Sequence, residues 1–397
     1  MLRSLFSGIS GLRANQTMMD VTGNNIANVN TVGFKSSGTV FQDTLSQTLQ
    51  SAGAPTATAG GTNPAQVGLG VRVAGITTNF GQGAAQSTGR STDLMVQGDG
   101  FFIQEVGGQQ MYTRGGALSF DATGRLVSPD GGIMQGWVAN AAGVVDINQP
   151  VADLALPLGA TLPAAATTGV LLSGNLPADT TSTTPLQTSI DVYDAQGNQR
   201  SLDASFTRTS NTTWSVTLSD GVATTGPTPL TFDATGPNAG ANPTPATMTV
   251  GGVQVDLSKL TGFAGISSLG VQSQNGAAAG GLEGFSIGPD GTLTGVFTGG
   301  RRRSLGQIAL ATFNNPTGLV KSGGSSYSAT PNSGIPQVGV AGSGSRGKLA
   351  GGVLEMSNVD LAQEFTNLII AQRGFQANSR VITASDEILQ DLVNLKR

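Results

Sequence analysis

The chain has 397 residues, including 59 glycines, no cysteine and no histidine; 11% of the residues are charged and the net charge is −4. The missing cysteines exclude disulfides and thiolate chemistry, and the missing histidines exclude the usual general base, the usual metal ligand and Ser–His catalytic sites. Twenty Lys and Arg residues provide no basic field for nucleic acid, and the length predicts two or three domains.

The N-terminus begins like a signal peptide with Met1-Leu2-Arg3, but Ser, Gly and Arg13 interrupt the apolar run. No apolar run is long enough to form a membrane-spanning helix. We therefore expect an uncleaved chain without membrane insertion, which is either cytoplasmic or exported by a route that reads no such signal.

Residues 1–30 are predicted to form a helix, because apolar residues recur at spacings of three and four or at multiples of seven. The stripe consists of Leu2, Leu5, Ile9, Leu12, Met19 and Ile26. Residues 22–31 contain four asparagines within seven positions, which indicates a helix end and a sharp turn, and also suggests hydrogen bonds between subunits. An extended stretch is expected to begin at Val32.

The middle of the chain, about 68–345, is predicted to be β structure, with Leu69, Val71 and Val73 alternating in a strand. Turn residues flanked by apolar residues indicate hairpins at 94–103, 118–127 and 285–297, followed by a strand at 305–313. A further β region around 190–218 lies between stretches rich in Ala, Thr and Pro. We expect it to be a β domain inserted into another β domain, because the strand pattern resumes after it.

The last forty residues again show an apolar stripe, and Ser357-Asn358 followed by Asp360 and Leu361 is a plausible helix start. The stripe includes Leu354, Leu361, Phe365, Leu368, Phe375, Ile382, Leu389 and Val393. Neither terminal helix can bury its stripe alone, so we expect the two to pair with each other and with copies from other chains.

The predicted fold is therefore mainly β with α-helical termini, in which nested β domains join paired coiled-coil-like helices. The expected parts are a helical inner core (1–30 with 355–397), an extended linker (31–68 with 346–354), a first β domain (69–150 with 280–345) and an inserted outer β domain (151–279).

Three motifs carry no enzymatic prediction. Residues 342–347 fit GxGxxG, but no βαβ alternation surrounds them, so we expect a flexible link before the last helix. The acidic residues are scattered, mostly in turns, where Asp caps its own backbone. Arg301-Arg302-Arg303 is interpreted as a solvated turn or a contact to a neighbouring subunit. We expect no catalytic residue, no metal, no cofactor and no enzyme.

Several segments in the right order resemble the rod/hook family of bacterial flagellar axial proteins. They are SLFSGISGL at 4–12, GNNIANVNTVGFK at 23–35, VGLGVRVAGI at 67–76, DLMVQGDGFF at 93–102, 354–382 and the final LVNLKR. The resemblance covers about half of the chain and marks a signature turn at Asn24, Asn25, Ile26, Asn28, Gly33 and Phe34. The length and the inserted β domain are similar to those of the hook members rather than the shorter distal rod members.

The resemblance implies a helical homopolymer, a curved tube that works as a universal joint between motor and filament. It further implies contacts with distal rod, hook cap and hook–filament junction proteins, and a location in the extracellular hook. Export through the flagellar type III apparatus is also implied, and Phe41 and Leu45 resemble its short gate-recognition motif, although one helical turn would fit the same spacing. A distal rod protein and a secreted β-rich adhesin remain the alternatives.

Overall fold

The computed structural model describes residues 2–55, 60–157, 159, 161–178, 184–210, 212–233, 240–241 and 243–394. The chain divides into two compact units. The first, which we call the helix-bearing unit, comprises Met1–Pro157, Ser286–Thr294 and Ser304–Arg397; the second, the inserted unit, comprises Leu158–Phe285 and Gly295–Arg303. Neither helix in the described part of the chain has the length and apolar character needed to cross a bilayer.

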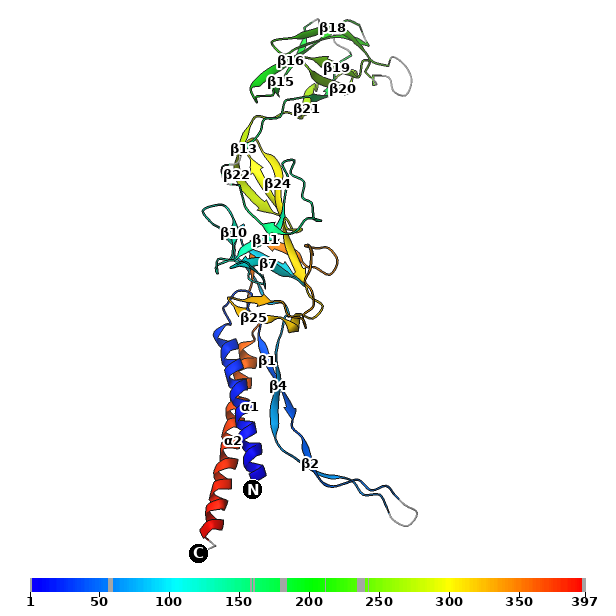
Figure 1. Cartoon of the computed structure of the whole chain (residues 1–397). Helices are drawn as coiled ribbons and strands as arrows, with labels where there is room; N and C mark the ends of the chain where they lie inside the picture. The colour runs from blue at the N-terminus through cyan, green and yellow to red at the C-terminus, as the bar shows by residue number, and fades with distance from the viewer. Residues whose placement is uncertain are drawn as a thin grey trace. The chain divides into compact units, whose positions relative to one another are not determined.

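The two ends of the chain form helices that lie side by side, α1 (Leu2–Ala27) and α2 (Leu361–Asn394) (Figure 1). Asp360 is the N-cap of α2, because its Oδ1 accepts hydrogen bonds from the backbone N–H groups of Ala362 and Gln363 at 2.9 and 3.3 Å. Terminal helices that pair within a mainly β chain confirm the predicted fold class.

A long β-hairpin follows α1, and we call residues 37–78 the arm (Figure 1). Its base pairs β1 (Ser37–Asp43) with β4 (Val71–Thr78), and its outer part pairs β2 (Ser46–Gln50) with β3 (Ala65–Gly68). The base packs on α1, where the Ser10 hydroxyl accepts a hydrogen bond from the Val71 N–H at 3.2 Å. The range expected to be an extended linker thus contains paired strands, and β4 joins the arm instead of the first β domain.

The β domain of the helix-bearing unit is built around a sheet with the order β24-β11-β7-β8-β26-β25. These strands are β24 (Arg301–Thr312), β11 (Ile133–Val138), β7 (Phe101–Val106), β8 (Gln109–Thr113), β26 (Ser326–Ser328) and β25 (Val320–Gly323). Attached to it are β9 (Ser119–Phe120), β10 (Leu126–Val127), β12 (Ala152–Asp153) and β27 (Gln337–Val340). Phe101, Tyr112, Phe313 and Tyr327 pack edge to face in its core.

The hairpin expected at 94–103 is wrong. Strand β6 (Leu94–Gln97) pairs with β28 (Lys348–Gly351), and β5 (Ala85–Ser87) pairs with β29 (Val353–Glu355), whereas β7 pairs with β8. The turn residues Gly98-Asp99-Gly100 favour a local reversal, but Asp99 forms a β-bridge with Arg346, and the chain passes from one sheet to another. The range 346–354 therefore supplies strands as well.

Two other segments also differ from expectation. Arg301-Arg302-Arg303 opens strand β24 and does not form a turn. Residues 342–347 form a closed turn between β27 and β28, in which the Gly342 N–H donates to the Gly347 carbonyl at 2.8 Å, so they do not lead into the last helix. By contrast, β9 and β10 form the expected hairpin, as do β22 (Gly280–Ile287) and β23 (Thr292–Phe297).

The inserted unit contains two four-stranded sheets with the orders β15-β16-β17-β18 and β19-β20-β14-β21. The first comprises β15 (Leu186–Tyr193), β16 (Gln199–Arg208), β17 (Thr213–Ser219) and β18 (Thr224–Thr231). The second comprises β19 (Thr247–Val250), β20 (Val253–Thr261), β14 (Gly169–Asn175) and β21 (Gly270–Gln274). One apolar cluster, including Phe206 and Trp214, draws on both sheets, and β13 (Thr161–Leu162) pairs with β22.

Candidate functional site

The helices α1 and α2 meet through small and polar side chains. Gly11 lies against Asn378, and Gly374 lies against Asn15; a Cβ at either glycine would stand 2.7 Å from the opposing amide. The two asparagines donate to the carbonyls of Gly11 and Gly374 in their own helices, at 2.8 and 2.9 Å. We call this contact the seam, and it keeps the helices close because no bulky side chain separates them.

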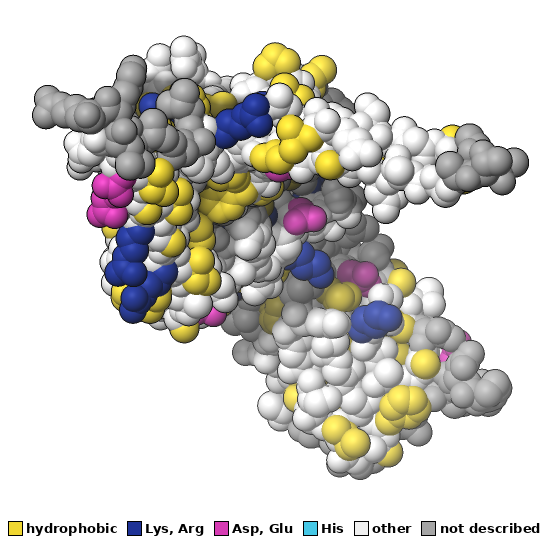
Figure 2. Space-filling view, turned by 90° about the horizontal axis from the view of Figure 1, so that it is seen from below, with side chains coloured by type: hydrophobic (Ala, Val, Ile, Leu, Met, Phe, Trp, Pro, Cys, Tyr) yellow, Lys and Arg dark blue, Asp and Glu magenta, His cyan; other side chains and the backbone are white. Residues whose placement is uncertain are grey.

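Part of the apolar stripe of α2 lies outside the seam. Phe365 is 52% exposed, Leu361 and Phe375 are also exposed, and Ile369, next to the stripe, is 56% exposed. Figure 2 shows hydrophobic side chains on the face of the molecule seen from below, with Lys, Arg, Asp and Glu side chains beside them. The stripe is thus available for contacts beyond the single chain.

The other residues of the predicted stripes of α1 and α2 are less exposed. Leu5, Ile9, Leu12, Ile26, Leu368, Ile382 and Leu389 are partly buried. Ile382 belongs to the seam, because a Cβ at Gly8 would stand 3.3 Å from its side chain. The side chains of Leu2 and Val393 lie outside the described residues.

The arm also exposes apolar side chains. Leu45 is 84% exposed and Leu49 is 61% exposed, while Val40, Phe41 and Ile76 are exposed to a smaller degree. Phe41 lies in β1 and Leu45 between β1 and β2, so the proposed export motif lies on extended chain and not on a helical turn. A two-stranded hairpin of this kind is marginally stable alone.

The signature turn after α1 is fastened within the chain. The buried side chain of Asn25 donates to the Ser37 carbonyl at 2.7 Å and to Glu364 at 3.0 Å, and accepts from the Ser37 N–H at 3.0 Å. Gly33 has a φ of +67°, and a Cβ there would strike the backbone of Gly115. These asparagine contacts are internal, and the suggested hydrogen bonds between subunits stay a prediction.

Three fully or almost fully buried charges meet behind this turn, a feature that the sequence did not predict. Lys35 Nζ lies 2.5 Å from Glu355 Oε1 and 2.8 Å from the Gly81 carbonyl, and Arg114 Nη1 lies 3.6 Å from Glu355 Oε2. Burial lowers the pKa of Lys35 and of Arg114, while Glu355 opposes this shift. This junction cluster joins the segment after α1, the segment before α2 and the β domain.

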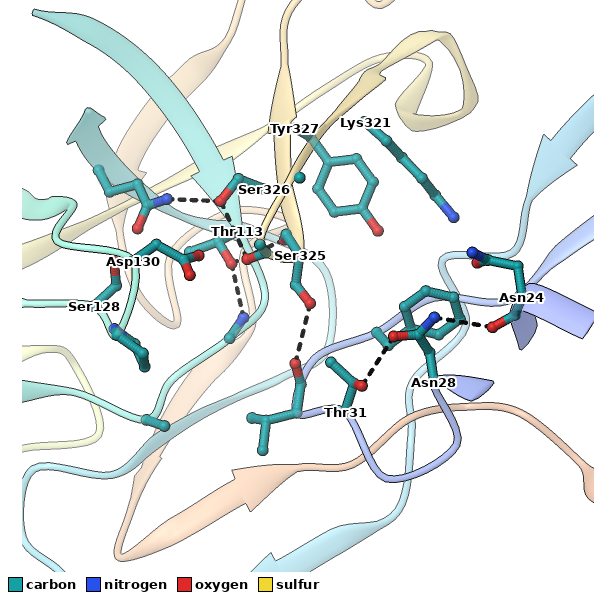
Figure 3. A pocket seen from close by; sticks show the side chains of 18 residues that line it. Asn24, Asn28, Thr31, Thr113, Ser128, Asp130, Lys321, Ser325, Ser326 and Tyr327 are labelled. Atoms are coloured by element: carbon teal, nitrogen blue, oxygen red, sulfur yellow. Dashed lines mark hydrogen bonds between the residues drawn. The ribbon is translucent and has the colours of Figure 1, made fainter. Parts of the chain in front are cut away.

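A pocket of about 430 Å³ opens beside the signature turn (Figure 3). Asn24, Asn28 and Phe34 line it from the α1 side, and Asp130 and Lys321 line it from the β domain. Asn28 donates to the Asn24 carbonyl and accepts from Thr31. Across residues 2–394 where the structure describes them, acidic side chains form no group of three that could hold a metal ion.

Four family models match segments of the chain, including both ends. They describe a flagella basal body rod protein (residues 5–35), a flagellar hook protein FlgE/F/G D1 domain (95–172), a flagellar basal body protein FlaE D2 domain (157–277) and a flagellar basal body rod FlgEFG protein C-terminal region (350–395). The flagellar hook protein FlgE of Borreliella burgdorferi is 40% identical over 100% of both chains. This chain belongs to the flagellar hook protein family.

Other relatives agree with this membership. The hook protein FlgE of Salmonella typhimurium is 34% identical over 99% of this chain and 100% of its own length. The basal-body rod protein FlgG of Bacillus subtilis is 35% identical over 100% of both. The crystal structure of Helicobacter pylori hook protein FlgE2 matches with a TM-score of 0.50 at 15% identity, covering 68% of this chain and 100% of that one, which shows a shared fold.

Proposed function

We propose that this chain is the structural subunit of the bacterial flagellar hook and polymerises into a curved tube that transmits motor torque to the filament. Membership of a family of hook proteins supports this proposal. The observation that carries it is the exposed apolar face of α2, which the seam leaves uncovered.

Burial of this face drives polymerisation. Covering one large apolar side chain completely contributes roughly 1.5–3 kcal/mol. Phe365, Ile369 and Phe375 are only partly covered in the single chain, so each gains burial when a second copy packs on it. The helices accordingly supply the cohesion of the tube.

The β domains supply contacts that slide. Only 11% of the chain is charged, and glycine is abundant, so contacts between neighbouring β domains consist largely of uncharged polar groups. Such contacts exchange hydrogen bonds through water at small cost. Each contact can then lengthen and shorten once per revolution while the helices hold the tube together.

The finer assignments form part of the same proposal. The tube joins the distal rod protein, the hook cap protein and the hook–filament junction protein, and subunits leave the cell through the flagellar type III apparatus without a cleaved signal peptide. The exposure of Phe41 and Leu45 supports their role as an export-gate motif, because a receptor can reach both side chains. The extracellular flagellum is the resulting location.

A distal rod protein is the second candidate, because FlgG of Bacillus subtilis is 35% identical over the full length. Electron microscopy of purified subunits tests both candidates. We expect wild-type subunits to form curved tubes, whereas straight rods would favour the distal rod assignment. A secreted adhesin would bind its target after deletion of 1–30 and 355–397, whereas a hook subunit loses all function.

A further inference from the structure

The floor of the pocket beside the signature turn has a hydrogen-bond acceptor without a partner. Gln104 lines the pocket and is 1% exposed; its Nε2 donates to the Ser326 hydroxyl at 2.8 Å. Its Oε1 is buried and accepts no hydrogen bond from the described residues. A buried acceptor in this state costs free energy until a donor reaches it.

The rim of the pocket has a carboxylate that its own turn does not use. Asp121, Asp194 and Asp290 each accept a hydrogen bond from the backbone N–H two residues later, at 2.8, 2.9 and 3.1 Å. The turn at Asp130 differs, because there the backbone N–H two residues later, that of Gly132, donates to the Ser128 hydroxyl at 3.1 Å and not to the Asp130 carboxylate. Asp130 forms no ion pair or side-chain hydrogen bond with the described residues.

The cation already in the pocket is engaged elsewhere. Lys321 lies across the pocket from Asp130 (Figure 3). Its Nζ donates to the Ser37 hydroxyl at 2.9 Å and to the Lys35 carbonyl at 3.2 Å, and stands 4.9 Å from the centre of the Phe34 ring. The Gln104 and Asp130 side of the pocket therefore has an unpartnered amide oxygen and an unpaired carboxylate, next to the negative end of the α1 dipole at Asn24 and Asn28.

We propose that this pocket receives a cationic side chain, an arginine or a lysine, from a second copy of this chain. An inserted guanidinium or ammonium group donates to Gln104 Oε1 and pairs with Asp130, which satisfies both acceptors at once. The inference rests on the proposed function, because only a homopolymer brings a second copy to the pocket in every subunit.

Charge complementarity supports a second copy as the occupant. Arg302, Arg373 and Arg380 are exposed and form no ion pair within the described part of the chain. The surface thus offers donors that match the acceptors of the pocket. A contact of this kind fixes the register between copies, while the apolar helix faces provide cohesion.

Photocrosslinking in assembled tubes tests the proposal. Pro129, at the rim, is replaced by p-benzoylphenylalanine, and tubes are grown from an equal mixture of ¹⁴N- and ¹⁵N-labelled subunits. We expect mixed-isotope crosslinks to a peptide in which an arginine or lysine lies at or beside the linked residue. Crosslinks confined to one isotope, or mixed crosslinks to peptides without a cation, overturn the proposal while the tubes themselves uphold the proposed function.

Substitutions give a second measurement. Removing one charge-assisted hydrogen bond costs about 1.5–3 kcal/mol, so Asp130→Asn should raise the subunit concentration needed for polymerisation about tenfold or more. Asp146→Asn, at another exposed turn of the same unit, is the matched control and should leave that concentration unchanged. Equal concentrations for Asp130→Asn and wild type overturn the inference, and wild-type subunits that never polymerise overturn the proposed function instead.

Discussion

The inserted unit and the terminal helices differ in how completely a single chain buries their apolar side chains. In the inserted unit, Phe206 and Trp214 are 0% and 2% exposed within one shared cluster. In α2, Phe365 and Ile369 are more than half exposed, and the seam is made of glycine and asparagine. The inserted unit therefore forms an apolar core within one chain, whereas α2 leaves an apolar face uncovered.

The largest expected effect comes from Phe365→Asp. Because Phe365 is 52% exposed, a charge there is tolerated in the monomer but opposes burial in the polymer. We expect an unchanged monomer melting temperature and no tubes in electron micrographs. Gln376→Asp, at an exposed polar position of the same helix, serves as the control and should still polymerise. Normal tubes from Phe365→Asp would show that the exposed apolar face of α2 is not needed for polymerisation.

The next effect comes from breaking the junction cluster with Lys35→Met, which leaves Glu355 buried beside Arg114 without its closer partner. Removing one member of a buried ion pair costs about 3–5 kcal/mol. We expect the melting transition of the helix-bearing unit to fall while that of the inserted unit stays in place.

The triple variant Lys35→Met/Arg114→Met/Glu355→Leu separates charge from packing at this cluster. It removes all three buried charges and leaves none of them without a partner, so much of the lost stability should return when unfolding is followed by calorimetry. A triple variant as unstable as Lys35→Met would show that the cluster acts through shape and not through charge.

A smaller effect is expected within the seam. Gly11→Ala places a methyl group against Asn378 and displaces its amide, which offsets the helix-propensity gain of alanine, so α1 should be less stable than in Gly23→Ala. Gly23→Ala is the matched control, because nothing lies within 4 Å of its added Cβ, and it should stabilise α1 by about 0.5–1 kcal/mol. Helical circular dichroism during thermal unfolding measures both. Equal stabilisation by the two substitutions would contradict the close seam.

The smallest expected effect is the loss of folding stability at acidic pH. Hydrogen bonds from neighbouring groups lower the pKa of Asp194, Asp256 and Asp290 below the ordinary 3.8. The unfolded chain then binds more protons in this range, so stability is complete above about pH 4 and decreases as pH falls through the lowered values. Melting temperatures measured between about pH 5 and pH 2 should decline only in the lower part. Asp194→Asn should weaken this dependence in the inserted unit, and an unchanged slope would contradict the role of its turn.

Local patterns were predictable from the sequence. The hairpins at 118–127 and 285–297 follow from turn residues flanked by apolar residues, because both strands lie next to the turn. The two terminal helices follow from apolar spacing and from a polar start at Asp360. In these cases the interactions that decide the structure join residues close in sequence.

Pairings between distant segments were not predictable. Strand β6 pairs with β28, although the Gly98-Asp99-Gly100 turn favoured β7 as its partner. Lys35 and Glu355 lie 320 positions apart, so no local sequence pattern predicts that they pair. The apolar stripe of α2 was visible, but the spacing did not distinguish the face that meets α1 from the face left for other copies. The proposed cation site depends on the unpartnered side-chain oxygen of Gln104, and the sequence does not show which side-chain atoms lack a partner.

Segments near the start of the chain pair with segments near its end, and this pairing has a consequence for incomplete chains. Strand β6 obtains its partner from β28, and Lys35 obtains its counter-ion from Glu355, both of which lie beyond residue 347. A chain that stops before that point leaves β6 without its partner strand and Lys35 without its counter-ion. Prematurely terminated products therefore cannot complete the helix-bearing unit, although the inserted unit keeps its own core.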